Sequence, residues 1–102
     1  MGNAVVIKNG LARRIDPKTK GDRGSVGGSN VVSGASDGDY IVLHYANGLA
    51  RRYDANTGAD RGSVGGSNVV ACSFGKGMII LKYANGLSRK YDPKTGADRG
   101  SA

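Results

Sequence analysis

Hydrophobic residues gather in short runs along the chain, and turn-forming residues separate these runs. In the middle of the chain, residues 40–45 read YIVLHY, a run rich in β-branched and aromatic side chains, and residues 49–53 read LARRY. The Asn47-Gly48 pair between them is typical of a β-hairpin, because both residues tolerate a positive φ. The pattern therefore predicts two antiparallel strands joined by a tight turn.

Two further strand candidates flank this hairpin. Residues 30–36, NVVSGAS, come before the hairpin, and the turn SDGD at 36–39 joins them to it. Residues 60–64 follow the hairpin after the turn DANTG at 54–58. Asp54 is expected to cap the second turn with its side chain, since Asp bonds readily to the backbone of the residues that follow it. The pattern predicts a unit of four short antiparallel strands, and no stretch has the spacing of an amphipathic helix.

The same unit recurs along the chain. Asn-Gly-Leu occurs at 9–11, 47–49 and 85–87, a period of 38 residues, and residues 29–64 match 67–102 at 21 of 36 positions. Self-similarity at a fixed period is the signature of a repeat architecture. We interpret residues 1–102 as a single repeat domain made of a partial repeat (1–28), a full repeat (29–66) and a nearly full repeat (67–102).

The third predicted strand and its turn, NGLARRYDANTG, resemble the blades of WD-repeat-like β-propellers. Tyr53-Asp54 stands where that family places Trp-Asp, and Ile15-Asp16 and Tyr91-Asp92 hold the equivalent positions. The resemblance implies an all-β fold of antiparallel four-stranded repeats that stack as propeller blades. A β-trefoil, which also has three four-stranded repeats, is the alternative fold.

The number of predicted strands leaves a propeller incomplete within one chain. The three repeats supply three, four and four strands, whereas a propeller ring needs about four to eight blades. Exposed blade faces and strand edges favour association, so the fold is expected to be completed by homo-oligomerisation.

Composition and charge narrow the function without naming it. The 102 residues include 18 Gly and no Trp, and 15 Lys and Arg face eight acidic residues, all Asp, giving a net charge of +7. Such a charge attracts nucleic acid or acidic polymers non-specifically, and it also keeps a small protein soluble. No apolar run approaches the length of a membrane span, and the start MGNAVVIKNG lacks the features of a signal peptide, so we expect no membrane partner and a cytoplasmic location.

The basic residues recur at fixed positions of the repeat. In the strand LARRY, Arg51 shares one face with Leu49 and Tyr53, and Arg52 lies on the other face with Ala50. One interpretation is that Asp–Arg pairs between units set the angle between repeats, because an isolated buried charge is costly. The other is that a repeated cluster binds a polyanion. The candidate residues are Arg14, Arg52, Lys90, Arg23, Arg61 and Arg99.

Catalytic residue types are scarce. His44 is the only His and is replaced by Lys82 in the next repeat, which favours a position on a sheet face. Cys72 is the only Cys, so it forms no internal disulfide, and its small neighbours favour packing inside the fold. We find no metal-ligand spacing and no cofactor motif, and we expect a protein that is not an enzyme.

Three functions remain open. The first is a structural or interaction module, a self-assembling β-propeller-like ring that presents repeated surfaces to a macromolecular partner. The second is binding of nucleic acid or an acidic glycan through the repeated Arg and Lys positions. The third is an oligomeric lectin, which the absence of Trp disfavours.

Overall fold

A computed structural model describes residues 4–102, so Met1, Gly2 and Asn3 at the start of the chain lie outside the described residues. Over this range the chain forms an all-β fold of three antiparallel sheets without a helix. The first sheet contains β1 (Ala4–Lys8), β2 (Leu11–Ile15) and β3 (Asp22–Val26). The second contains β4 (Val31–Ser36), β5 (Tyr40–Tyr45), β6 (Ala50–Asp54) and β7 (Asp60–Ser63). The third contains β8 (Val69–Gly75), β9 (Met78–Tyr83), β10 (Ser88–Tyr91) and β11 (Asp98–Ser101).

The predicted strands of the middle repeat are confirmed. β5 spans the predicted residues 40–45, β4 and β7 each differ from their predicted bounds by one residue at one end, and β6 is shifted by one residue at both ends. Within each sheet the strands follow chain order, each pairing antiparallel with the next. Each sheet is thus a meander whose hydrogen bonds come from residues close together in the sequence.

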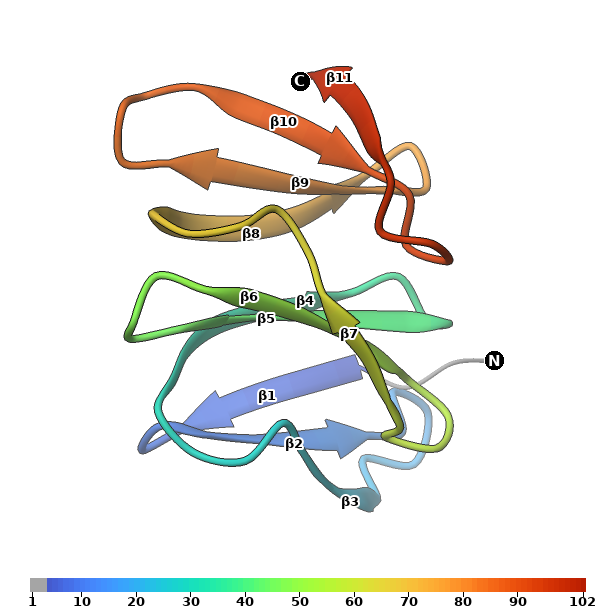
Figure 1. The fold of residues 1–102 in the computed structure, drawn as a ribbon. Helices are drawn as coiled ribbons and strands as arrows, with labels where there is room; N and C mark the ends of the chain where they lie inside the picture. The colour runs from blue at the N-terminus through green and yellow to red at the C-terminus, as the bar shows by residue number, and fades with distance from the viewer. Residues whose placement is uncertain (1–3) are drawn as a thin grey trace.

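The three sheets stack face to face in chain order, with the second sheet in the middle (Figure 1). A hydrophobic core fills each of the two spaces between neighbouring sheets. The core between the first and second sheets includes Ala12, Val26, Val31, Ile41, Leu43, Tyr53 and Ala55. The core between the second and third sheets includes Val42, Ala50, Val64, Val69, Ile79, Leu81 and Tyr91. Because side chains alternate along β5, Ile41 and Leu43 enter one core and Val42 enters the other.

The hairpin of the first sheet is one residue shorter than its counterparts. Lys8 pairs with Leu11 across the two-residue turn Asn9-Gly10, in which both residues have positive φ, whereas Tyr45 N–H bonds to the Leu49 carbonyl across a three-residue loop. β1 therefore aligns with β5 only when one residue is left out. By cross-strand pairing, Val6 takes the position of Leu43 and Lys8 that of Tyr45.

The segments that join the sheets are held by side chains of the sheet that follows. The Tyr83 hydroxyl donates to the Gly65 carbonyl at 2.6 Å and lies 2.6 Å from the Tyr91 hydroxyl, and the Tyr45 pair repeats this arrangement at Gly27. Gly65 has a φ of 77°, and a Cβ built there would lie 2.2 Å from Leu81 Cδ1. A side chain does not fit at this position, which gives a physical reason for glycine where the chain crosses from one sheet to the next.

Candidate functional site

Arg14 and Arg52 connect each sheet to a turn of the next sheet. Arg52 is buried, with 7% of its surface exposed. Its Nη1 donates to the carbonyls of Pro93 (3.2 Å) and Lys94 (2.9 Å) in the third sheet, and its Nη2 donates to the Arg61 carbonyl at 2.6 Å. Arg14 repeats the arrangement one sheet earlier, donating to the carbonyl of Asn56 (2.8 Å) and to that of Arg23 (2.7 Å). These guanidinium groups act as clamps between consecutive sheets.

A glycine in each turn makes room for the clamp. A Cβ at Gly96 would lie 3.0 Å from Arg52 Nε, and one at Gly58 would lie 3.2 Å from Arg14 Nε. Each Nε is buried and has no hydrogen-bond partner in the part of the chain that the structure describes, and each guanidinium reaches its carbonyls through the two terminal nitrogens. Because the guanidinium group is planar and forked, one arginine side chain can donate hydrogen bonds to a strand of its own sheet and to a turn of the next sheet.

The prediction that Asp–Arg pairs join neighbouring units is wrong. Each of the six ion pairs among residues 4–102 joins two residues of the same sheet or its turns, two pairs in each sheet. They are Arg13–Asp22, Arg23–Asp16, Arg51–Asp60, Arg61–Asp54, Arg89–Asp98 and Arg99–Asp92. Within the described range, Arg14 and Arg52 form no ion pair with a carboxylate, and backbone carbonyls hold them. Sequence spacing placed Asp beside Arg in every repeat but did not reveal which Arg it pairs with.

Arg23, Arg61 and Arg99 hold equivalent exposed places on β3, β7 and β11, with 51% to 56% of each side chain exposed. Each bonds an aspartate that also caps the preceding turn. For Asp16, the bond from Arg23 and the N–H groups of the turn hold the pKa of the carboxyl below its ordinary value. Burial of the Asp54 carboxyl acts against the same shift, and the turn N–H groups and Arg61 outweigh it. The expected turn-capping role of Asp54 is confirmed by bonds to the N–H groups of Asn56 and Thr57.

The candidate polyanion residues are thus divided among three settings. Arg14 and Arg52 face the next sheet and spend their terminal nitrogens on carbonyls, while Arg23, Arg61 and Arg99 lie at the surface in ion pairs. Lys90, the third-repeat counterpart of Arg52, is half-buried on the open side of the third sheet. The structure does not bring the six residues into one cluster, and their binding of a polyanion stays a prediction.

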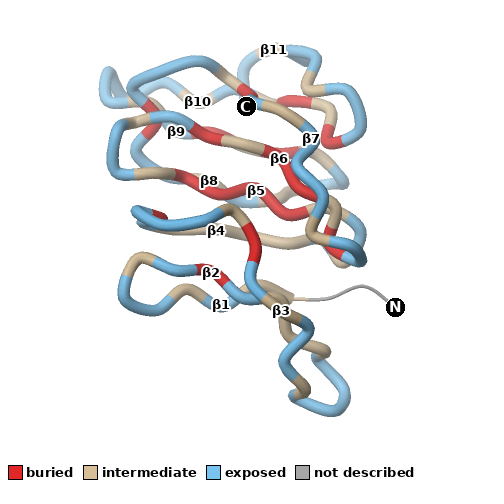
Figure 2. Tube along the Cα trace, turned by 60° about the horizontal axis from the view of Figure 1, so that its bottom comes forward, coloured by how far each residue is buried: buried red, intermediate tan, exposed pale blue. Residues whose placement is uncertain are grey.

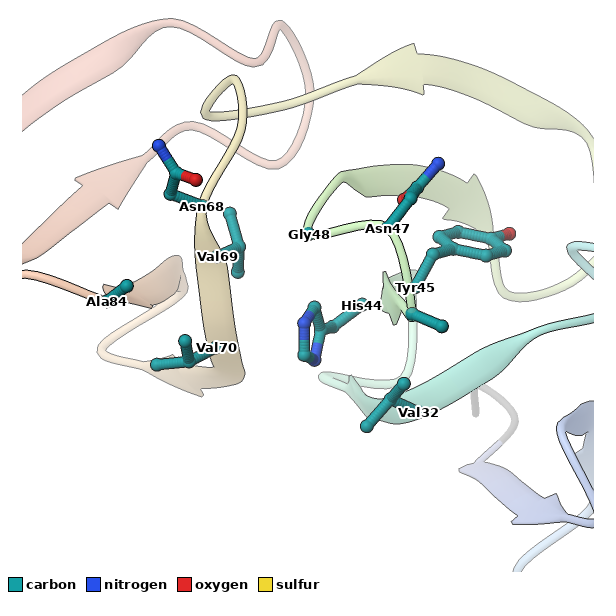
Figure 3. Close-up of a pocket in the computed structure, with 10 residues that line it drawn as sticks. Val32, His44, Tyr45, Asn47, Gly48, Asn68, Val69, Val70 and Ala84 are labelled. Atoms are coloured by element: carbon teal, nitrogen blue, oxygen red, sulfur yellow. The ribbon is translucent and has the colours of Figure 1, made fainter.

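His44 is buried and lines a groove between the second and third sheets. The groove has a volume of about 460 Å³ and is lined by His44, Val32 and Asn47 on one side and by Asn68 and Val70 on the other (Figure 3). His44 Nδ1 lies 3.2 Å from Ser33 Oγ, which in turn lies 3.8 Å from Cys72 Sγ. His44 therefore has a neighbour for one ring nitrogen on the adjacent strand.

Cys72 packs where sequence reasoning expected it. It contacts the core between the second and third sheets, and burial raises the pKa of its thiol. A raised pKa reduces the fraction of the thiol that is deprotonated to the reactive thiolate. Among residues 4–102, no group of three or more His, Cys, Asp or Glu side chains is placed to hold a metal ion.

One face of the first sheet is uncovered. Its residues, which we call the first-sheet face, are Val6, Lys8, Leu11, Arg13 and Ile15. Val6 is 52% exposed, although Leu43, which has the same place in the second sheet, is fully buried. Ile15 likewise has the place of Tyr53, which is 5% exposed. Val6 and Ile15 thus hold positions that are buried in the second sheet, on a face that no other sheet covers among the described residues.

The opposite face of the third sheet is also uncovered. This third-sheet face includes Gly75, Lys76, Met78, Ile80, Lys90, Ser101 and Ala102. Ile80 is half-buried, whereas its second-sheet counterpart Val42 is fully buried. Figure 2 shows the buried segments running through β5, β6, β8 and β9, between these two outer faces. The number of predicted strands indicates exposed blade faces but does not identify the residues on them, and burial of the equivalent positions in the second sheet identifies those residues.

Comparisons with known proteins give the class of this fold. No family model matches the chain, and the search of curated proteins found no match. Among solved structures, the computationally designed Ika4 protein is similar with a TM-score of 0.72 and 21% identity over 97% of this chain and 69% of that one. The crystal structure of the computationally designed Ika8 protein is similar with a TM-score of 0.71 and 21% identity, covering 97% of this chain and 35% of that one.

The chain is therefore an all-β protein of stacked antiparallel sheets, and its structural neighbours include designed β proteins. It spans about a third of the length of Ika8. The likeness to a WD-repeat blade has no counterpart among the family models. In the part of the chain that the structure describes, no helix is long and apolar enough to cross a membrane.

Proposed function

We propose that this chain is a non-enzymatic structural and interaction module that self-assembles into a β-propeller-like ring. In this arrangement the third-sheet face of one copy stacks on the first-sheet face of the next. The interface between copies then repeats the interfaces within the chain. Such head-to-tail contacts close into a ring when the rotation between neighbours allows it.

The equivalence of the two open faces to buried faces carries the proposal. The second sheet contacts the first through Leu43 and Tyr53, and it contacts the third through Val42 and Arg52. Val6 and Ile15 hold the first set of positions on the first sheet, and Ile80 and Lys90 hold the second set on the third sheet. The two ends of the stack thus offer complementary halves of an interface that the chain already forms twice.

The number of sheets favours two copies. Each chain contributes three sheets, so two chains give six, which lies within the range of about four to eight blades for a propeller. Stacking would place Lys90 of one copy near the turn at Pro17 and Lys18 of the next, as Arg52 lies near Pro93 and Lys94. Its ammonium group would donate to the carbonyls of that turn.

Sedimentation equilibrium over a range of protein concentrations tests the proposal. We expect a species of about twice the 10.5 kDa chain mass. Val6→Glu and Ile80→Glu should each dissociate it, because each buries a charge without a partner at one half of the interface. Val32→Glu is the matched control, since Val32 is 54% exposed but lies on neither face. A stable monomer at all concentrations, or dissociation by Val32→Glu as well, would contradict the proposal.

Polyanion binding is the second candidate, favoured by the exposed row of Arg23, Arg61 and Arg99. β3, β7 and β11, which carry these residues, lie on the same side of the stack (Figure 1). Titration of DNA, RNA and heparin at several salt concentrations tests it. Affinity that falls linearly with salt on a log–log plot would support it, and no binding at low salt would remove it.

A further inference from the structure

The first sheet has one strand fewer than the other two. In the second and third sheets an additional edge strand, β4 or β8, pairs with the strand that corresponds to β1. Both of these edge strands follow an Asn with positive φ and begin with Val-Val. Among the described residues, nothing pairs with the equivalent edge of β1.

We propose that the free edge of β1 binds an extended peptide of the same kind as β4 and β8, which adds to the first sheet as a fourth, antiparallel strand. This inference goes beyond the proposed ring and does not depend on it, because it concerns the edge of the first sheet and the ring uses its face. Addition of a strand to an exposed sheet edge is a general mode of peptide recognition.

The hairpin fixes which backbone groups of β1 are free. In a two-residue hairpin, the residues that flank the turn form a hydrogen-bonded pair, here Lys8 and Leu11. Because this pattern alternates along an antiparallel ladder, Val5 and Ile7 direct their N–H and C=O groups away from β2. Their counterparts on β5 are Val42 and His44, and these two pair with Ala35 and Ser33 of β4.

β4 defines which side chains the added strand can carry. The strand would lie beside β4 as β4 lies beside β8. On β4, the side chains that face the third sheet are small: Ser33 lies 3.8 Å from Cys72 Sγ, and Ala35 packs against the core. An added strand would direct the same two positions at the second sheet.

The surface of β4 that would receive these side chains is already crowded. A Cβ at Gly34 would lie 2.7 Å from Leu43 Cδ2 and 2.9 Å from Ile7 Cδ1. Large side chains on the facing positions of an added strand would meet these groups. The occupant is therefore an extended segment with Val-Val followed by small residues at the alternate positions that face β4.

A peptide copied from the chain itself is the sharpest probe. We choose residues 29–38, SNVVSGASDG, carrying a fluorescent label and titrated with the full chain by fluorescence anisotropy. Saturable binding is expected. N-methylation at the position of Ala35 removes an N–H that faces β1 and should weaken binding about tenfold, the value of one hydrogen bond of about 1.4 kcal/mol. N-methylation at Gly34 is the matched control, because that N–H points away from β1, and it should leave the affinity nearly unchanged.

Amide hydrogen exchange locates the bound peptide. Saturating peptide should slow exchange at Val5 and Ile7, whereas Val6, which is already paired with β2, should show little change. Three results would overturn the inference: no saturable binding, equal losses for the two methylated peptides, or protection changes confined to β5 and β9. The last result would mean that the peptide exchanges with the chain's own edge strands.

Discussion

Replacement of Arg52 tests whether the guanidinium clamp holds neighbouring sheets together. Arg52→Met keeps much of the side-chain length and its apolar stem but removes every donor. The carbonyls of Pro93, Lys94 and Arg61 would then lose their bonds from the guanidinium. The perturbation is confined to one interface, that between the second and third sheets.

The expected magnitude follows from these contacts. A hydrogen bond from a charged group contributes about 1.5–3 kcal/mol, but the buried cation also costs desolvation energy, and its Nε has no partner. We therefore expect Arg52→Met to lower the free energy of unfolding by about 2–4 kcal/mol, less than the sum of three bonds. Arg52→Lys, which introduces the residue found at position 90, should lose about half as much, because one ammonium group replaces a two-nitrogen fork.

Urea denaturation at a fixed protein concentration is the assay, because association would make the apparent stability depend on concentration. Arg99→Met is the control: it removes an arginine of β11 in the third sheet, whose side chain is 52% exposed and paired with Asp92. This control should stay close to the parent, because exposed ion pairs contribute little. The clamp would be refuted if Arg52→Met lowered the free energy of unfolding by less than about 1 kcal/mol, or if Arg99→Met lowered it as much as Arg52→Met does.

Two further predictions concern the segments between sheets and the ion pairs. Gly65→Ala should lower the free energy of unfolding by more than about 2 kcal/mol, because its Cβ would clash with Leu81 and Tyr83. Gly66 has a similar φ of 73°, but a Cβ there would meet no described atom within 4 Å, so Gly66→Ala should lower the free energy of unfolding by only about 1 kcal/mol. Equal losses in urea denaturation would show that crowding is not the cause. Five of the paired aspartates have a pKa below the ordinary value of 3.8, so the unfolded chain binds protons first as the pH falls, and their stabilisation is present above about pH 4 and lost below it. The urea concentration at the unfolding midpoint should decrease as the pH is lowered from 5 to 2.5. A midpoint that stays constant over this range would contradict a stabilising role for the aspartate ion pairs and turn caps.

The strands and their faces could be predicted because both depend on local patterns. The β-branched and aromatic run at 40–45, the short strand at 49–53 and the Asn-Gly turn between them determine a hairpin whichever sheet lies above or below it. Side chains alternate along β6, as predicted, so that Arg51 bonds Asp60 within the sheet and Arg52 faces the third sheet. These features require only contacts between neighbouring strands.

The partners of the buried arginines could not be predicted in the same way. Arg52 binds backbone carbonyls 41 and 42 residues away, and a carbonyl leaves no trace in the residue types. The nearby Asp in every repeat suggested a partner, yet it pairs with the arginine on the other face. The displaced register of β1 did leave a signal, since Lys8-Asn9 lacks the residue that corresponds to Ala46. Comparison of hairpin lengths would have shown which residues of β1 correspond to those of β5.

The proposed contact between copies uses weaker parts than the contacts within the chain. Inside the stack, Tyr45 and Tyr53 bond each other, and Tyr45 also bonds the carbonyl of a linking glycine, whereas Lys8 and Ile15 hold these places on the first-sheet face. On the third-sheet face, Lys90 replaces the arginine clamp and offers a single ammonium in place of a planar fork. Both halves keep apolar residues that can stack, and both offer fewer hydrogen bonds to fix the geometry. Association through these faces would therefore rest mainly on apolar burial, with less of the directional bonding that sets the angle between sheets inside the chain.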